Sequence, residues 1–130
     1  MYNIDTSEIY VYEKESLRDM KISKELLKGS TALMVLRVIA EEDMYGYRII
    51  REISDRSGDT FKLNEGTLYP ILHMLEKEGH LTSYDGQSET GRSRRYYRIT
   101  TQGKLHLAAR IREWQAFSDA VTMVLGTEGV

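Results

Sequence analysis

The sequence contains no cysteine. This absence excludes disulfide scaffolding and thiolate chemistry, and it is compatible with a reducing cytoplasm. No apolar run approaches the ~20 residues that are needed to span a bilayer, so no membrane segment is expected. The N-terminal stretch is acidic and lacks the basic-then-apolar order of a secretion signal. These absences predict a cytoplasmic protein without a membrane partner.

Groups typical of a catalytic or metal site are also missing. The histidines show no metal-ligand spacing, and there is no cysteine to complete a site. The sequence has no glycine-rich phosphate loop and no nucleophile with a convincing base partner. We therefore expect no enzymatic activity, no metal and no cofactor. A small hydrolase, in particular, has no catalytic constellation to support it.

Positive charge, by contrast, is strongly segregated along this chain of 130 residues. The formal net charge is −2, yet residues 90–112 carry positive side chains and no negative one. These cations are Arg92, Arg94, Arg95, Arg98, Lys104, Arg110 and Arg112. Removing these seven positive charges from −2 leaves −9 for the remainder. Such a block predicts a surface for a polyanion, although the sequence pI of about 5.9 argues mildly against nucleic-acid binding.

Three helices are predicted in the first two thirds of the chain. Ser23 is a suitable N-cap for a helix that extends to Glu42, and a second helix follows over 45–57. A third helix begins near Asn64 and ends at Gly79, with its first turn bent around Pro70. The acidic segment 41–44 is expected to be a solvent-exposed connection between the first two helices.

The last third predicts a hairpin and a long helix. Segments 81–84 and 96–100 are rich in β-formers, and residues 85–95 between them are expected to form a long flexible tip that holds the arginines. A final helix is predicted over 101–125 from its apolar spacing. The fold class is therefore mostly α with a small two-stranded β wing, a winged helix-turn-helix plus a long C-terminal dimerisation helix.

This order of elements defines three expected regions. Residues 1–22 form an N-terminal arm, disordered or with a short strand. Residues 23–100 form the winged-helix DNA-binding domain, and residues 101–130 form the C-terminal dimerisation helix. The whole chain is expected to have a single core because of its length.

Three sequence runs resemble the PadR family of bacterial transcription regulators. They are YGYRIIREI, LNEGTLYPILHMLEKEGHL and GRSRRYYRITTQG, within a resemblance that covers residues 26–125. The single long helix after the wing is similar to the shorter of the family's two architectures. The resemblance implies a dimeric repressor, and many such proteins release DNA when a small molecule binds. The arm before residue 23 is longer than this family pattern implies.

Arginines of the predicted tip are the first candidates for DNA contact. Guanidinium groups of Arg92, Arg94 and Arg95 can reach phosphates or enter a minor groove. The alternative is a solvated loop whose charges serve solubility. Tyr96 and Tyr97 are neighbours on a strand and face opposite sides, so one is expected in the core and the other exposed or near the DNA backbone. The sequence leaves that choice open, and Tyr97 is included among the predicted contacts.

The start of the third helix supplies the remaining candidates. Backbone amides at a helix N-terminus attract phosphate, and hydroxyl or amide groups can meet phosphate or base edges. The candidates are Lys62, Asn64, Thr67 and Tyr69. Asn64 is better explained as a helix cap. For Tyr69, packing against the second helix explains the residue as well as DNA contact does. The third helix carries few positive charges, so the wing is expected to supply most of the electrostatic attraction.

Trp114 and Phe117 lie one turn apart on the last helix. The favoured interpretation is a homodimer seam. A second interpretation, compatible with the first, is the wall of an effector cavity for a small hydrophobic or aromatic ligand. In a dimer, two recognition helices would meet successive major grooves of double-stranded DNA, about 34–36 Å apart on an inverted-repeat operator. The alternative function is a winged-helix adaptor that binds protein and no longer touches DNA.

Overall fold

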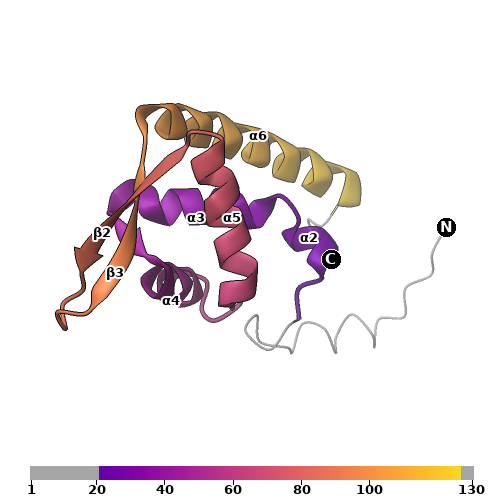
Figure 1. Ribbon diagram of the computed structural model, residues 1–130. Coiled ribbons are helices and arrows are strands. Elements are labelled where there is room, and N and C mark those ends of the chain that lie inside the picture. The colour runs from indigo at the N-terminus through magenta and orange to yellow at the C-terminus, as the bar shows by residue number, and fades with distance from the viewer. Residues whose placement is uncertain (1–20, 127–130) are drawn as a thin grey trace.

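The computed structural model describes residues 21–126, which form five helices and a three-stranded antiparallel sheet (Figure 1). The elements are α2 (Lys24–Leu27), α3 (Ser30–Glu41), β1 (Met44–Tyr45), α4 (Gly46–Arg56), α5 (Glu65–Lys77), β2 (Leu81–Gln87), β3 (Ser93–Ile99) and α6 (Thr101–Leu125). The predicted class, mostly helical with a small wing and a long C-terminal helix, is confirmed. Most of the predicted N-terminal arm lies outside the described residues.

The first predicted helix is two helices. Ser23 caps α2 as expected, since its Oγ accepts a hydrogen bond from the backbone N–H of Leu26. Gly29 then adopts a left-handed conformation with φ of 84°, and α3 begins at the next residue. A helix cannot continue through that backbone geometry, whereas glycine adopts it at no steric cost. The prediction of one continuous helix over 23–42 is therefore wrong at Gly29.

The third predicted helix, α5, begins where the sequence indicates. Asn64 is its N-cap, and its Oδ1 accepts a hydrogen bond from the backbone N–H of Thr67 at 2.9 Å. The helix continues through Pro70 to Lys77. Proline is tolerated there because it lies near the N-terminus and removes a single backbone bond, that to the carbonyl four residues earlier. Gly79, with φ of 84°, follows the end of the helix.

The wing is larger than predicted. β2 and β3 pair antiparallel from Leu81↔Ile99 to Gln87↔Ser93, so the connecting turn is residues 88–92 alone. The short strand β1 pairs with the other edge of β3, which makes the sheet order β1-β3-β2. Polar residues can occupy these strands because alternate positions face solvent while the backbone groups pair. The predicted hairpin of two strands is therefore confirmed, but the sheet has a third strand that was not predicted. The prediction of a tip over 85–95 is wrong, because residues 85–87 and 93–95 lie in the strands.

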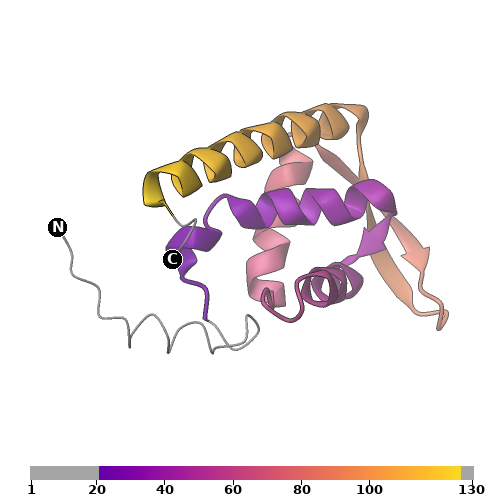
Figure 2. The same cartoon turned by 180° about the vertical axis from the view of Figure 1, so that it is seen from behind.

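The core lies between the helices and one face of the sheet. α3 passes between α6 and α4, with α5 on the far side in the reverse view (Figure 2). The buried residues of the core are apolar and come from every element except α2. They are Val35, Leu36, Val38, Ile39, Met44, Ile49, Ile53, Leu68, Leu72, Leu75, Leu81, Tyr97, Ile99 and Leu107. This core holds α5 and the wing in a fixed relation to each other.

The start of α6 is anchored to the base of the wing. Thr100 caps the helix through its Oγ1, which accepts from the backbone N–H of Gly103 at 2.9 Å and donates to the carbonyl of Gly79 at 2.7 Å. Gly103 packs so closely on the backbone of His80 that a Cβ would clash with the His80 carbonyl. Within residues 21–126, no helix combines the length and apolar character that a bilayer crossing requires.

Candidate nucleic-acid interface

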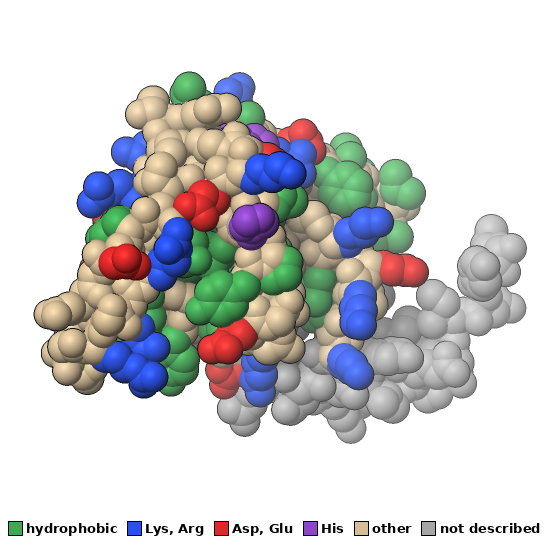
Figure 3. All heavy atoms as spheres, in the orientation of Figure 1, with side chains coloured by type: hydrophobic (Ala, Val, Ile, Leu, Met, Phe, Trp, Pro, Cys, Tyr) green, Lys and Arg blue, Asp and Glu red, His purple; other side chains and the backbone are tan. Residues whose placement is uncertain are grey.

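The exposed side of α5 is the first part of the candidate interface. Thr67 is exposed in its first turn, and Lys62 is exposed just before the helix. Asn64 acts as the cap, so its side-chain oxygen is already engaged by the Thr67 amide. Figure 3 looks onto α5 and shows Lys and Arg side chains on the wing side and on the α2 side of this helix. The N-terminal half of α5 thus presents polar groups between basic flanks.

Tyr69 combines the two roles that the sequence left open. Its ring is 45% exposed, so it is available at the surface of α5. Its hydroxyl nevertheless lies against Gly46, the first residue of α4, where an added Cβ would be 2.6 Å from the Tyr69 oxygen. Tyr69 therefore joins the two helices of the helix-turn-helix and still leaves part of its ring accessible to a ligand.

The wing arginines do not share one tip, which corrects the sequence prediction. Arg92 lies exposed in the turn, whereas Arg94 and Arg95 belong to β3. Successive residues of a strand face opposite sides. Arg95 lies on the side of α5, because its Nη2 donates to Ser83 Oγ at 2.7 Å, and Ser83 Oγ donates to Glu76 Oε2 at 2.5 Å.

Arg94 lies on the other face of the sheet. Its guanidinium carbon is 5.2 Å from the centroid of the Tyr45 ring, and its Nε is buried without a hydrogen-bond partner in the described structure. Arg94 is thus turned away from α5. Of the predicted arginines, Arg92 and Arg95 remain exposed, and Arg95 is linked through Ser83 to α5.

Tyr97 is a core residue, with 5% of its surface exposed. Its assignment as a DNA contact is therefore corrected, because a buried ring offers almost no surface to a duplex. Burial also raises the pKa of the Tyr97 hydroxyl. Tyr96 is the partly exposed member of the pair, and it lies on the same outer face of the sheet as Arg94.

The outer face of the wing carries a row of aromatic rings. Tyr96 lies between Tyr45, at 5.5 Å edge-to-face, and Tyr84, at 5.6 Å stacked. The hydroxyl of Tyr84 donates to Asp43 Oδ2 at 2.6 Å, and Arg98 donates to the same oxygen from Nε at 3.0 Å. Segment 41–44 is therefore solvent-exposed as predicted at Glu41 and Glu42 only, because Asp43 anchors the wing and Met44 is buried in β1.

Asp43 is an ionised carboxylate held by these donors. Partial burial alone would raise its pKa, but the hydrogen bonds from Tyr84 and Arg98 and the charge of Arg98 outweigh burial. The pKa of Asp43 consequently lies below its ordinary value. The pKa of the Tyr84 hydroxyl is raised, chiefly because it donates to Asp43.

The block of seven cations is not one surface. Arg98 is paired with Asp43 on the outer face of the wing, and Arg110 is paired with Glu113 on α6 at 2.7 Å. Sequence reasoning also did not single out Lys21, Lys24 and Lys28, which are exposed around α2. Their spacing within eight residues is the signal that would have found them. Exposed cations near α5 therefore come from two places, the wing and the region of α2.

The distal part of α6 presents exposed apolar side chains. Leu107 is buried and Ile111 half-buried, but the side chains that follow turn to solvent. Trp114 is 49% exposed and Phe117 66% exposed. The other large exposed apolar residues after Phe117 are Val121, Met123, Val124 and Leu125. By helical spacing all of these except Met123 lie on one side of α6, and an exposed apolar surface of this kind is typical of a protein interface.

Titratable groups of the described residues form no cluster of three or more that could hold a metal ion. His73 is exposed on α5, while His80 and His106 stack on each other with ring centroids 4.0 Å apart. Burial lowers the pKa of His106, with smaller contributions from His80 and Arg110. The geometry is that of a polar helix beside a basic hairpin, which suits binding to a duplex.

Known proteins have a similar architecture and a similar sequence. The family model described as transcriptional regulator PadR-like family matches residues 35–109. A transcriptional regulator from Mycobacterium tuberculosis is 34% identical over 103 residues, which cover 79% of this chain and 90% of that protein. A solved transcriptional regulator from Clostridium thermocellum is 32% identical, with a TM-score of 0.71, and the match covers 78% of this chain and 96% of that one.

A PadR-like transcriptional regulator from Bacillus cereus is similar to the same extent. Its solved structure has a TM-score of 0.70 and 31% identity, and the match covers 78% of this chain and 97% of that one. The family model alone spans more than half of the chain. Together with the winged-helix geometry, these matches show that the chain belongs to the PadR-like family of transcriptional regulators, which are not enzymes.

Proposed function

We propose that this regulator is a homodimeric repressor that binds an inverted-repeat operator through α5 and the wing. The proposal includes release from DNA by a small apolar or aromatic effector. PadR-like regulators bind DNA and are generally dimeric, which supports the DNA-binding and dimeric parts. The protein would act where transcription takes place, in the bacterial cytoplasm.

One observation carries the DNA-binding part. The Arg95–Ser83–Glu76 hydrogen-bond chain ties the cation Arg95 of the wing to the C-terminal end of α5, and the N-terminal half of the same helix is exposed. This chain links the wing to α5, so a duplex that accepts α5 in its major groove can meet the guanidinium of Arg95 at a phosphate. Phosphate contacts fix position and supply affinity, while side chains at the start of the helix meet base edges.

The dimer part rests on the exposed apolar surface of α6. Trp114 and Phe117, with the apolar side chains after them, have too few neighbours within their own chain to be buried. Packing against the same surface of a second copy would remove them from water, since an isologous interface uses one patch twice. The two α5 helices could then address two half-sites of one operator.

The remaining part of the proposal is an effector site between the two copies. Aromatic rings provide flat apolar walls, and Trp114 and Phe117 lie on the surface that a second copy would face. Tryptophan fluorescence titrated with planar hydrophobic cations and with phenolic acids tests this part. A ligand that shifts Trp114 emission and weakens operator binding supports release; the absence of both effects across the panel removes it.

The test of DNA binding is a gel shift of the protein on the DNA upstream of its own gene. A retarded band that withstands competitor DNA is expected, with affinity that falls steeply as salt rises. Arg112→Gln on α6 is the matched control for Arg95→Gln, because both remove one arginine and only Arg95 lies on the wing. If the wild-type protein shifts neither upstream nor random duplexes, the adaptor function replaces the repressor.

A further inference from the structure

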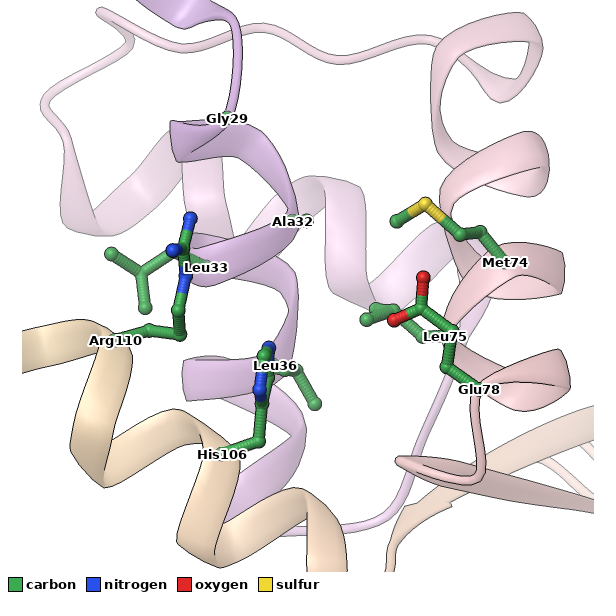
Figure 4. A pocket seen from close by; sticks show the side chains of 9 residues that line it. All are labelled: Gly29, Ala32, Leu33, Leu36, Met74, Leu75, Glu78, His106 and Arg110. Carbon is green, nitrogen blue, oxygen red and sulfur yellow. The ribbon is translucent and has the colours of Figure 1, made fainter.

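A cavity of about 240 Å³ lies within one copy of the chain, between α3, α5 and α6 (Figure 4). Its walls are largely apolar: Leu33 and Leu36 come from α3, and Met74 and Leu75 come from α5. An apolar cavity of about 150 Å³ is large enough for benzene. The space here therefore accommodates a single aromatic ring with a short side chain.

Three polar side chains line the same cavity. Figure 4 shows the carboxylate of Glu78 and the ring of His106 on opposite sides of it, with Arg110 farther along α6. The charge of Arg110 is neutralised by Glu113, whose Oε1 is 2.7 Å from Nη1 of Arg110. Burial lowers the pKa of His106, so this imidazole is neutral near pH 7 and adds no positive charge.

Glu78 is the one acid among the residues that line the cavity. Within the described residues its ion-pair contact is with Nδ1 of His80, at 3.4 Å, and its side chain is 49% exposed. The cavity therefore combines an apolar floor with a half-exposed carboxylate at one side, which is the complement of an amine attached to an apolar ring.

We propose that this cavity binds a small amphipathic amine, its ring against Leu36, Met74 and Leu75 and its ammonium at Glu78. The site is separate from the Trp114 and Phe117 surface, because it is lined by the first three turns of α6 and not by the distal part. A second copy bound to the distal part of α6 would leave the cavity free for the amine. The inference does not depend on DNA binding, and its test uses no DNA.

The probe is 2-phenylethylamine, compared with 2-phenylethanol and 3-phenylpropanoate, which keep the ring and replace the positive charge with none or a negative one. Binding is followed on the full chain through the methyl signal of Met74 after [13C]methyl-methionine labelling. The expected order of affinity is amine, then alcohol, then carboxylate. Equal shifts by all three probes, or none by the amine, would overturn the proposal.

Two variants test the residues. Glu78→Gln is expected to weaken amine binding about fivefold without changing alcohol binding, since a half-exposed ion pair is modest. Glu65→Gln, an exposed acid at the other end of α5, is the matched control and should leave amine binding unchanged. Ala32→Leu adds bulk to a cavity wall and should weaken both the amine and the alcohol at least about tenfold.

Trp114 fluorescence distinguishes the cavity from the distal surface of α6. The amine should shift the Met74 methyl and leave Trp114 emission unchanged. If it moves Trp114 and not Met74, the amine binds the distal surface and the cavity assignment fails. If the Met74 signal follows protein concentration and ignores the amine, a second copy fills the cavity, which also contradicts the proposal.

Discussion

The winged-helix part buries its apolar side chains within the chain, whereas the distal part of α6 exposes them. In residues 30–107, leucine, isoleucine and valine side chains of α3, α4 and α5 meet in one core. After Ile111, the apolar side chains of α6 project into solvent, up to 87% exposure at Val124. The first part can therefore fold on contacts of its own, whereas the second exposes apolar side chains in the way that is typical of a surface covered by another molecule.

The same contrast separates recognition from assembly. The core holds α5 and the wing, the elements that we propose contact DNA, as one rigid unit, which we call the reading unit. Thr100 and Gly103 anchor α6 to it. The free length of α6 then extends away from that unit. A chain built in this way can hold two reading units at a set spacing through one helix, as an inverted repeat requires.

Phe117→Asp is the substitution with the largest expected effect on this comparison. A charge on the exposed apolar surface of α6 should prevent pairing of two copies, while the winged-helix core stays intact. Operator affinity is expected to fall about 10³-fold, because a monomer loses the second, linked half-site. Sedimentation velocity and fluorescence anisotropy on labelled operator measure the two effects. Gln115→Asp, an exposed polar position on the same helix, is the control, and equal losses in both variants would contradict the account.

Truncation of apolar side chains should distinguish the two parts by stability. Leu36→Ala, in the core, is expected to lower the free energy of unfolding by about 3 kcal/mol through lost burial and a residual cavity. Val124→Ala, at an exposed position, should change it by no more than about 0.5 kcal/mol when both are measured on the monomeric Phe117→Asp background. Urea denaturation followed by circular dichroism gives both values. Similar losses at the two sites would show that distal α6 is packed within its own chain.

The two faces of the wing can be compared through neighbouring arginines. Arg95→Gln, on the side of α5, is expected to weaken binding to operator and random duplexes alike by about fivefold and to reduce the salt slope by about 1. Arg94→Gln should have a smaller effect, because that guanidinium lies over Tyr45 on the other face. Binding titrations at several salt concentrations measure both. A larger loss from Arg94→Gln would reverse the assignment of the two faces.

The smallest expected effect concerns the acid that anchors the wing. The folded-state pKa of Asp43 lies below its ordinary value of about 4, so its contribution to stability is fully present above that pH. The contribution is lost as pH falls through the lowered folded-state pKa. Asp43→Asn should therefore cost about 0.5 kcal/mol at pH 6 and less at pH 3, measured by urea unfolding. A cost that stays constant between these pH values would mean that ionisation of Asp43 is not its source.

Local signals in the sequence were sufficient for several elements. A capping residue and a stop residue are short-range features, and Ser23, Asn64 and Gly79 mark helix ends in the structure as the sequence indicates. The break at Gly29 was missed because apolar spacing continues across it, although the backbone there is left-handed. Periodicity reports which face is buried and is insensitive to a local change of direction.

Errors in the wing have a different origin. Arg94 and Arg95 stand in a glycine- and serine-rich context, yet they lie in β3 because they pair with Gly86 and Asp85 of β2. Strand propensity depends strongly on such tertiary context. The orientation of Tyr97 likewise follows from cross-strand register, Ser83↔Tyr97 and Met44↔Tyr97, which involves residues distant in sequence.

The number of chains on one operator tests the central claim most directly. Sedimentation equilibrium of the protein with a fluorescent duplex that carries the upstream inverted repeat measures this stoichiometry. Two chains per duplex are expected for the wild type, and one weakly bound chain for Phe117→Asp. A wild-type complex with a single chain, or two chains that persist in Phe117→Asp, would contradict the claim that α5 and the wing bind DNA while the distal part of α6 pairs two copies.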